Sequence, residues 1–561
     1  MNRCCRKCVF LAAMLLAAFT GEIYAQQPIS NLVPEPITKS GLSIELEDFV
    51  QIPASDNGSS AKARINMLRS SHDKTGRLFV NDLRGKLWVI QDETPSVYLD
   101  VKTEKPNFKD SPGLGTGFGS FAFHPEFSTN GKFYTAHTEN PGSGTADFAG
   151  PAQPVAELQG VVTEWTASDP AANIFEGDSR ELLRIDIYRT IHGLQDMKFN
   201  PNAMPGDADY GKLYICQGDG GGVDRGLPEN SHRLDSILGT ILRIDPLGTN
   251  SRNGKYGIPA DNPFASDDDA DTLDEIWAWG FRNPHRIAWD LGGDQKMLIG
   301  EIGQHGIEEI NIGAAGANYG WNVREGMFLI NPHGNLRQLF TLPADDSTNG
   351  FTYPVAQYDH DEGDAIVGGY VYRGSSSPDL TGLYIFGDIK KGRLFYVPVD
   401  SLQTGKQAKI HELTIFYKGE ERTILNIVNH SRADIRFGID DDGELYLLSK
   451  VDGTIKRILG GNAVSVDDKK QTQPVRYALS QNYPNPFNPE TTIEFELAVD
   501  EVVNLSVYNQ LGQKVATLIN ERRTAGSHSV TFDASQLASG IYFYEMKTVS
   551  FTARKKMILI R

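Results

Sequence analysis

The sequence predicts an all-β protein, in which a six-bladed β-propeller is followed by a small β-sandwich. The first observation is a short strand-like sequence motif that recurs six times, at intervals of 55 to 87 residues. The copies are GRLFV (Gly76–Val80), GKFYTA (Gly131–Ala136), GKLYI (Gly211–Ile215), QKMLIGE (Gln295–Glu301), GLYIFGD (Gly382–Asp388) and GELYLLS (Gly443–Ser449). The second observation is a change of composition near residue 460, after which short alternating runs follow one another to the end of the chain.

Most copies of the repeat are followed by a turn and a second apolar run, as in Gly85–Ile90, Gly392–Val397 and Gly453–Leu459. A strand, a Gly turn and a paired strand make a hairpin, because Gly provides the backbone freedom that such turns need. Units of this length have room for four strands, and radial repetition packs each sheet between its neighbours without a long open edge. We therefore expect six blades within residues 40–460; scattered hairpins in another all-β fold are the alternative.

The first 25 residues predict a signal peptide. Arg3, Arg6 and Lys7 precede the apolar run Val9–Phe19, which is too short for a permanent membrane span, and Ala25 fits a cleavage site. No later segment contains 18 consecutive apolar residues, so we expect no transmembrane segment in the mature chain.

Charge and cysteine content fit an exported protein. The formal net charge is −18, and removal of a segment with three basic residues and one acidic residue leaves about −20. This charge argues against nucleic acid or anionic lipid as a partner. Cys216 is the one cysteine after the signal segment, so the mature chain has no internal disulfide, and we expect Cys216 to be a small buried residue.

A domain boundary is predicted after residue 460. Residues 461–476 are polar and linker-like, and Pro484, Pro486 and Pro489 then impose an extended lead-in. The alternating runs that follow predict a small antiparallel sandwich over residues 477–561.

This tail resembles the C-terminal sorting domain of type IX secretion cargo. The resemblance rests on NYPNPFNP, VYNQLGQKV, GSHSVTFDASQLASGIYFY and the terminal KKMILIR. It implies a partner in the type IX secretion machinery and export through the periplasm and outer membrane, to the medium or the cell surface. Whether the tail is cleaved stays open, and a carbohydrate-binding sandwich is the alternative.

Three loops of the predicted propeller carry polar groups suited to chemistry. His192 directly precedes a strand and is a candidate proton acceptor near neutral pH; a structural His is the alternative. Arg282 lies among aromatic residues and offers planar donors to a carboxylate or an alkoxide, unless it only pairs with an acid between blades. Gly303 permits a turn that directs carbonyl groups at a cation, and Glu308 and Glu309 are hard ligands suited to calcium, although paired acids usually face solvent.

At these loops the chain resembles the glucose/sorbosone dehydrogenase family, the soluble PQQ-dependent aldose dehydrogenases. The match is collinear over about residues 40–460 and implies a six-bladed propeller. The matching texts are FAFHPEF (Phe121–Phe127), the His192 loop, YICQGDGG (Tyr214–Gly221), LGTILRIDPLG (Leu238–Gly248), GFRNPHRIAWD, GEIGQHGIEEIN with ANYGW, VGGYVYRG (Val367–Gly374), IFGDIKKGRLF (Ile385–Phe395) and FGIDDDGELYLLS.

The resemblance implies PQQ and calcium as cofactors and a role for each matching residue. His192 resembles the general base, and Arg282 resembles the residue beside the reactive carbonyls of PQQ. The other residues in PQQ-binding positions are Asn283, Gly303, Gln304, Lys390 and either Arg432 or Arg436. Carbonyl groups of Gly303 and Gln304 fall where the activating calcium is held, and Glu308, Glu309 and Tyr319 fall near a structural calcium site.

Four positions depart from the glucose enzymes: Gly115 and His285 each stand where a Gln is expected, Ile191 replaces an Asp, and Ile302 replaces a Gln. These changes remove polar contacts to PQQ and resemble the branch related to hedgehog-interacting proteins. The function expected first is a secreted calcium- and PQQ-dependent sugar dehydrogenase that passes electrons from a small sugar to an unknown acceptor. The alternatives are a non-catalytic cell-surface propeller that binds a glycan or protein, and a calcium-dependent lactone hydrolase.

Overall fold

The computed structural model describes residues 26–56, 61–112, 115–148, 155–267, 269, 271–331, 333–460, 477–497, 499, 501–524 and 526–560. Its contacts divide the chain into two compact units, Met1–Ala463 and Val464–Arg561. The predicted signal segment 1–25 and linker 461–476 lie outside the described residues. Among the residues that are described, no helix is long and apolar enough to cross a membrane.

The first unit is built from groups of four antiparallel strands. In chain order, five groups are β2 (Ile65–Ser70), β3 (Leu78–Asp82), β4 (Lys86–Gln91) and β5 (Thr94–Asp100); β6 (Phe118–Phe123), β7 (Lys132–Glu139), β8 (Leu158–Ala167) and β9 (Gly177–Ile187); β10 (Leu194–Phe199), β11 (Leu213–Gln217), β12 (Thr240–Ile244) and β13 (Ile276–Trp279); β14 (Pro284–Trp289), β15 (Met297–Glu301), β16 (Ile307–Ile312) and β20 (Ala356–Asp359); and β21 (Ile366–Val371), β22 (Leu383–Asp388), β23 (Leu394–Pro398) and β24 (His411–Tyr417).

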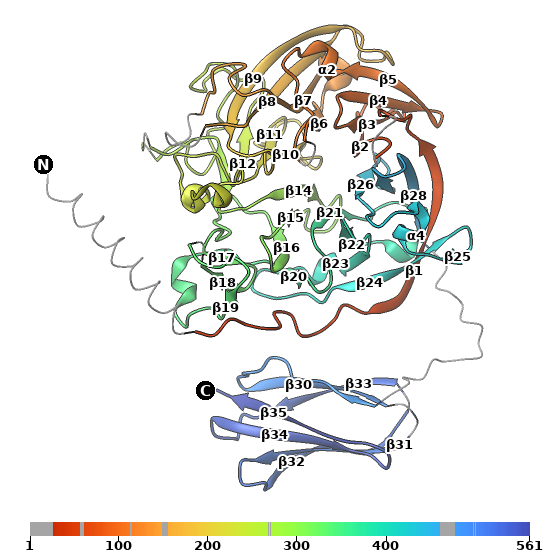
Figure 1. The fold of residues 1–561 in the computed structure, drawn as a ribbon. Coiled ribbons are helices and arrows are strands. Elements are labelled where there is room, and N and C mark those ends of the chain that lie inside the picture. The colour runs from red at the N-terminus through yellow and green to blue at the C-terminus, as the bar shows by residue number, and fades with distance from the viewer. Residues whose placement is uncertain are drawn as a thin grey trace, which may run out of the picture. The chain divides into compact units, whose positions relative to one another are not determined.

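The sixth group joins the two ends of this unit. It contains β26 (Ile435–Ile439), β27 (Leu445–Ser449), β28 (Thr454–Gly460) and the N-terminal strand β1 (Lys39–Gln51). β1 pairs antiparallel with β28 and parallel with β24, so it closes the ring between the fifth and sixth groups. The first strands of the groups contact each other in cyclic order around the centre, which is the arrangement of a β-propeller with six described blades (Figure 1).

The six copies of the sequence motif form the second strands of the six described blades, which are β3, β7, β11, β15, β22 and β27. The second apolar runs after Gly85, Gly392 and Gly453 form the third strands β4, β23 and β28. The second strands are buried on both faces because apolar side chains pack between neighbouring blades. One such cluster joins side chains of β7–β9 with those of β10–β12. Cys216 belongs to another such cluster, between the third and fourth blades, and is fully buried, as predicted.

Short helices and short strands lie in the connections between the blade strands. They are α2 (Val101–Glu104), α3 (Phe127–Asn130), α4 (Ile424–Val428), η1 (Val223–Arg225), η2 (Pro228–His232), η3 (Asp346–Asn349), η4 (Pro378–Leu380), η5 (Val399–Ser401), the two-residue strand β25 (Glu420–Glu421), and a small sheet of β17 (Arg324–Glu325), β18 (Phe328–Ile330) and β19 (Leu339–Phe340). The small sheet lies within the connection from β16 to β20, so it is an insertion in the fourth blade.

The topology brings the candidate residues to one face of the propeller. In each antiparallel blade, the loop that enters the first strand and the loop between the second and third strands lie at the same end. His192, Arg282 and Arg432 precede the first strands β10, β14 and β26, while Gly303 and Lys390 lie between second and third strands. This end is called the site face below.

The second unit consists of two sheets. One contains β29 (Ala478–Leu479), β30 (Glu490–Leu497) and β33 (Gly526–Asp533); the other contains β31 (Glu501–Asn509), β32 (Lys514–Arg523), β34 (Gly540–Lys547) and β35 (Thr552–Leu559). Side chains of both sheets, including Phe495 and Leu505, share one apolar core, so the unit is a β-sandwich. Its alternating sequence follows from the period of two along a strand that buries one face.

Candidate functional site

His192 is held at the site face by an acidic residue from the neighbouring loop. Its Nδ1 lies 2.7 Å from Oδ1 of Asp219, which follows β11. Burial alone raises the pKa of Asp219, but the nearby His192 and Arg282 side chains more than offset this and lower it. An ionised carboxylate on Nδ1 orients the imidazole and leaves Nε2 as the ring atom through which a base acts.

The His192 backbone is also constrained. Its φ of 54° lies in the left-handed region, and its carbonyl oxygen accepts the Gly220 amide at 3.0 Å. A Cβ at Gly218 would lie 2.6 Å from that carbonyl oxygen and 2.8 Å from the His192 Cβ. Gly218 therefore lets two loops approach closely enough for Asp219 to reach the ring.

Arg282 connects this pair to the loop after β15, which carries the calcium-site candidates Gly303 and Gln304. Its carbonyl oxygen accepts the Asp219 amide at 2.7 Å. Its Nε donates to Oε1 of Gln304 at 2.6 Å, and its Nη1 donates to the carbonyl of Ile302 at 3.1 Å. The guanidinium lies 5.9 Å from the ring centre of Trp321, within the range of a cation–π contact. Arg282 is thus a positioned cation whose described partners are neutral groups and a ring.

Asn283 presents an unsatisfied amide oxygen at the same place. The side chain is 5% exposed, and its Oδ1 is buried without a hydrogen-bond partner among the described residues. A Cβ at Gly218 would lie 2.8 Å from this oxygen, so Asn283 and His192 face the same small space. A buried polar atom without a partner costs free energy, which makes a bound ligand a natural partner for it.

Glu301 accepts hydrogen bonds from the backbone of both Arg282 and Asn283, although it was not among the residues predicted from the sequence. Its Oε1 accepts the backbone amides of Arg282 and Asn283 at 2.6 and 2.9 Å. Its Oε2 is buried and has no partner within the described part of the chain. Glu301 is the strand neighbour of Glu309, and burial, followed by the Glu309 charge, raises the pKa of Glu301 well above its usual range.

The loop from Gly303 to Ile307 wraps around another carboxylate. Oε1 of Glu325 accepts four consecutive backbone amides, those of Gln304, His305, Gly306 and Ile307, at 2.8 to 3.0 Å. Because the N–H and C=O of a peptide point in opposite directions, the carbonyl groups of Gly303 and Gln304 are directed away from Glu325. Two outward carbonyl oxygens are the kind of donor that calcium prefers.

Glu308, Glu309 and Tyr319 do not share a common point. Glu308 Oε1 lies 2.9 Å from His360 Nε2, while Glu309 Oε1 accepts the Gly326 amide at 2.5 Å on the opposite face of β16. The Tyr319 hydroxyl donates to the carbonyl of Ile312 at 2.6 Å. Burial raises the pKa of Glu309 to about 7, and neighbouring acids add to the rise. In the described ranges, no three His, Cys, Asp or Glu side chains gather tightly enough to hold a metal.

The remaining cations expected to bind PQQ, Lys390, Arg432 and Arg436, differ in burial. Lys390 is half exposed and lies 3.4 Å from Asp364, and Arg432 is similarly exposed and lies 3.5 Å from Asp434. Arg436 is instead 7% exposed and lines a cavity in the central channel. The spacing of these residues in the sequence gave no indication of this difference in burial.

The four positions that differ from the glucose enzymes provide few polar groups for a ligand. A Cβ at Gly115 would meet the backbone of Thr190 and Ile191 at about 3.0 Å, so no larger side chain fits there without movement. Ile302 packs against two apolar clusters of the fifth blade. His285 is buried with its Nδ1 3.1 Å from the carbonyl of Val367, and burial together with two nearby guanidinium groups lowers its pKa well below its usual value.

Three unselected acids therefore organise the site. Asp219 lies in the text YICQGDGG, where an acid directly after a strand end was the available signal, and Glu301 ends a repeated text in the same manner. Glu325 carries no such signal, because its partners are backbone amides 18 to 21 residues away.

The chain is similar to known proteins over both units. Residues 67–456 match the family model described as Glucose / Sorbosone dehydrogenase, and residues 481–560 match the Secretion system C-terminal sorting domain. The HIPL2 protein of Arabidopsis thaliana is 30% identical over 377 residues, which cover 58% of this chain and 50% of that protein. The hedgehog-interacting protein of Homo sapiens is 26% identical over 411 residues, covering 72% and 51%.

The chain spans about half the length of these curated relatives. Among solved structures, the soluble aldose sugar dehydrogenase of Escherichia coli in the apo-form is 18% identical. The match covers 75% of this chain and 99% of that chain with a TM-score of 0.51, which shows a shared fold.

Proposed function

The chain belongs to the glucose/sorbosone dehydrogenase family, and we propose that it is a calcium- and PQQ-dependent dehydrogenase that oxidises an aldose to a lactone. The observation that carries this proposal is the His192–Asp219 pair together with Arg282, whose backbone carbonyl accepts a hydrogen bond from the Asp219 amide. A base oriented by a carboxylate lies beside a cation, and these groups are suited to take the hydroxyl proton and to stabilise the negative charge that develops when a hydride passes to a bound quinone.

The C-terminal unit gives the protein its location. Its match to the sorting domain covers nearly the whole unit, and the domain marks cargo of the type IX secretion system. The protein is therefore exported, as a secreted or cell-surface protein. An extracellular sugar is the class of substrate available to an enzyme in that place.

In the proposed reaction, His192 Nε2 accepts the proton of the anomeric hydroxyl group. Asp219 keeps the ring in one orientation and stabilises the imidazolium that forms, because its carboxylate remains ionised beside it. PQQ, when bound, supplies the quinone that accepts the hydride. Arg282 places a fixed positive charge where negative charge develops.

The residues that would hold PQQ fit its chemistry in charge more than in number of polar contacts. Arg282, Lys390 and either Arg432 or Arg436 would provide cations for a tricarboxylate, and the orphaned Oδ1 of Asn283 would provide a polar contact. The carbonyl groups of Gly303 and Gln304 would hold the activating calcium.

The direct test is whether the purified full chain binds PQQ in the presence of calcium and then reduces a dye when aldoses are added. We expect binding to be saturable and the dye to be reduced with at least one aldose of a panel. A calcium-loaded protein that binds no PQQ, or binds it without oxidising any sugar, would count against the enzyme.

Calcium is expected to stabilise the propeller against heat. A ligand bound by the native state alone adds RT ln(1 + [L]/Kd) to stability, which is about 2.7 kcal/mol at 100 times Kd. Melting curves in EDTA and in millimolar calcium measure this effect, with magnesium as the control because its strict octahedral demand suits an open carbonyl turn poorly. Superimposable curves in EDTA and calcium would remove calcium from the proposal.

The second candidate is a non-catalytic propeller that binds a glycan or protein at the cell surface. It is favoured by Gly115, Ile191, His285 and Ile302, which provide no side-chain polar contact of the expected kind, and by the similarity to the hedgehog-interacting protein. A protein that fails to bind PQQ yet is retained on a glycan array would favour this candidate.

A further inference from the structure

The segment before β1, residues 29–38, links the fourth and fifth blades at the rim of the site face, and it is called the strap below. The Ile29 amide donates to the carbonyl of Leu339 in β19 at 2.9 Å. The Glu412 amide in β24 donates to the carbonyl of Thr38 at 3.1 Å. The strap therefore runs from the insertion of the fourth blade to the last strand of the fifth (Figure 1).

Polar side chains of the fourth and fifth blades hold the strap midway. The Val33 amide donates to Oδ2 of Asp359 at 2.9 Å. The Ile37 amide donates to Oε1 of Glu362 at 2.9 Å, and the Ile37 carbonyl accepts Nη2 of Arg393 at 3.1 Å. Because these partners are part of the blades, they fix which strap residue lies against each loop.

Leu32 is the strap residue that reaches the loop of the calcium-site candidates. A Cβ at Gly306 would lie 3.1 Å from Cδ1 of Leu32 and 2.5 Å from Cδ1 of Leu339. The two leucines therefore cover Gly306, which has no side chain of its own to fill this space. Leu32 and its neighbour Val33 pack against one apolar cluster, which contains Ile307, Trp321, Ile330 and Leu339.

The same loop is held on another side by Glu325. Its Oε1 accepts the four amides of residues 304–307. Gln304 in turn accepts Nε of Arg282 at 2.6 Å with its side-chain oxygen. A shift of Gly306 would therefore move Gln304, its contact with Arg282 and the carbonyl groups that the loop directs into the site.

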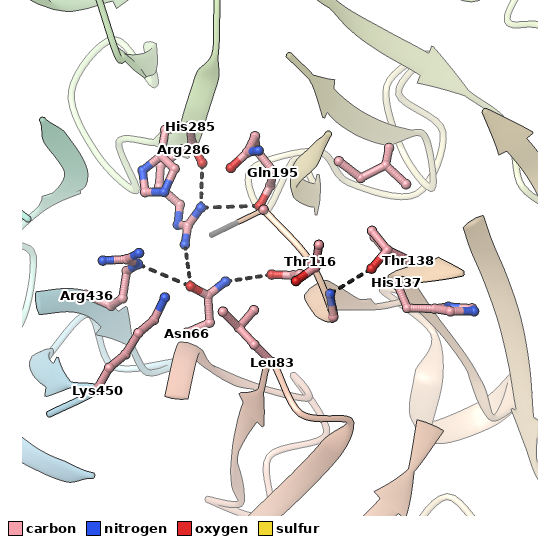
Figure 2. A pocket seen from close by; sticks show the side chains of 15 residues that line it. Asn66, Leu83, Thr116, His137, Thr138, Gln195, His285, Arg286, Arg436 and Lys450 are labelled. Atoms are coloured by element: carbon pink, nitrogen blue, oxygen red, sulfur yellow. Dashed lines mark hydrogen bonds between the residues drawn. The ribbon is translucent and has the colours of Figure 1, made fainter. Parts of the chain in front are cut away.

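The cavity at the mouth of the central channel is lined by other residues. Arg286 and Arg436 both donate to Oδ1 of Asn66 on its wall (Figure 2). Its described lining residues include none of residues 29–38 or 303–307. The strap therefore reaches the proposed cofactor site from the outer side, through the loop.

We propose that Leu32 is a positioning residue, through which the strap fixes the loop that directs the Gly303 and Gln304 carbonyl groups into the site. The physical reason is that outward movement of the loop would expose the apolar contact between Leu32 and Gly306 to water. That these carbonyl groups hold calcium rests on the proposed function, whereas the effect of Leu32 on the loop does not.

The test is hydrogen exchange of the amides of residues 304–307 in the full chain, without calcium or PQQ. Leu32→Ala is expected to raise their exchange rates about tenfold, because local opening then breaks fewer apolar contacts. Leu32→Met keeps an apolar side chain of similar volume and should restore most of the protection.

Ile37→Ala is the matched control. Ile37 is also a half-buried apolar residue of the strap, but it packs against a different cluster, between the fourth and fifth blades. Opening of the loop leaves that contact intact, so exchange at residues 304–307 should stay at the wild-type rate. If Leu32 served overall stability alone, the two alanine variants would behave alike.

Calcium titration of the same proteins by calorimetry gives a second readout. The affinity should fall in Leu32→Ala and stay unchanged in Ile37→Ala, because a cation site needs its ligands held in one geometry. Exchange rates in Leu32→Ala equal to those of the wild type, or raised equally in Ile37→Ala, would overturn the proposal. A wild type that binds no calcium would contradict the proposed function, while the exchange rates would still decide whether Leu32 fixes the loop.

Discussion

Replacement of His192 by alanine is expected to lower the turnover of sugar oxidation by about 10²–10⁴, which is the usual contribution of a general base. The physical reason is that Asp219 holds Nδ1 of the ring at 2.7 Å and directs the remaining nitrogen toward the substrate. The measurement is dye-linked oxidation by calcium- and PQQ-loaded protein. Affinity for PQQ should change little, because the cations proposed to hold its carboxylates remain.

Two further readouts separate a base from a structural histidine. Added imidazole should restore part of the rate of His192→Ala, and Asp219→Asn should shift the pH dependence of turnover because the ring loses its charged partner. His333→Ala is the control, since His333 is exposed and forms an ion pair with the exposed Glu229. If His192→Ala lost PQQ binding and thermal stability together with activity, the residue would be structural.

Glu325→Ala is expected to destabilise the propeller by about 3–5 kcal/mol, because it leaves four buried or half-buried backbone amides without an acceptor. The substitution also opens a space inside the loop that carries the calcium-candidate carbonyl groups. The urea midpoint of unfolding measures the effect, provided the slope of the transition is unchanged. The calcium response should disappear with the loop geometry.

Glu325→Gln separates the acceptor from the charge. Glutamine keeps an oxygen of the same reach, so its cost should be about 1 kcal/mol, the difference between charged and neutral hydrogen bonds. Similar midpoints for the Ala and Gln variants, or an Ala variant as stable as the wild type, would show that the four amides do not depend on this carboxylate.

Local sequence predicted the strands well because each strand needs little more than its own residues. The repeated apolar text after a Gly turn is long enough for one buried strand, and all six copies became second strands of blades. The period of two in the tail likewise predicted a sandwich with one buried face per strand. One strand that local pattern did not place is β1, whose partners in β24 and β28 are more than 360 residues away.

The candidate site was predictable in part for the same reason. His192 and Arg282 each precede a first strand, and a loop at that position must lie at one end of the ring. The distance between them along the chain says nothing about Asp219, which joins them through a side-chain contact and a backbone hydrogen bond. The grouping of Glu308 with Glu309 was misleading in geometry, because adjacent residues of a strand face opposite sides.

The sequence by itself determined the parts of this protein: the strands of the blades, the separate sandwich, and polar residues in three loops of the propeller. These follow from short-range rules of alternation and turn formation, which act within about ten residues. Only the tertiary structure decided which polar groups meet. Ring closure placed Asn66 between Arg286 and Arg436 and left Lys450 beside them, since contacts between blades depend on the positions of all six sheets at once.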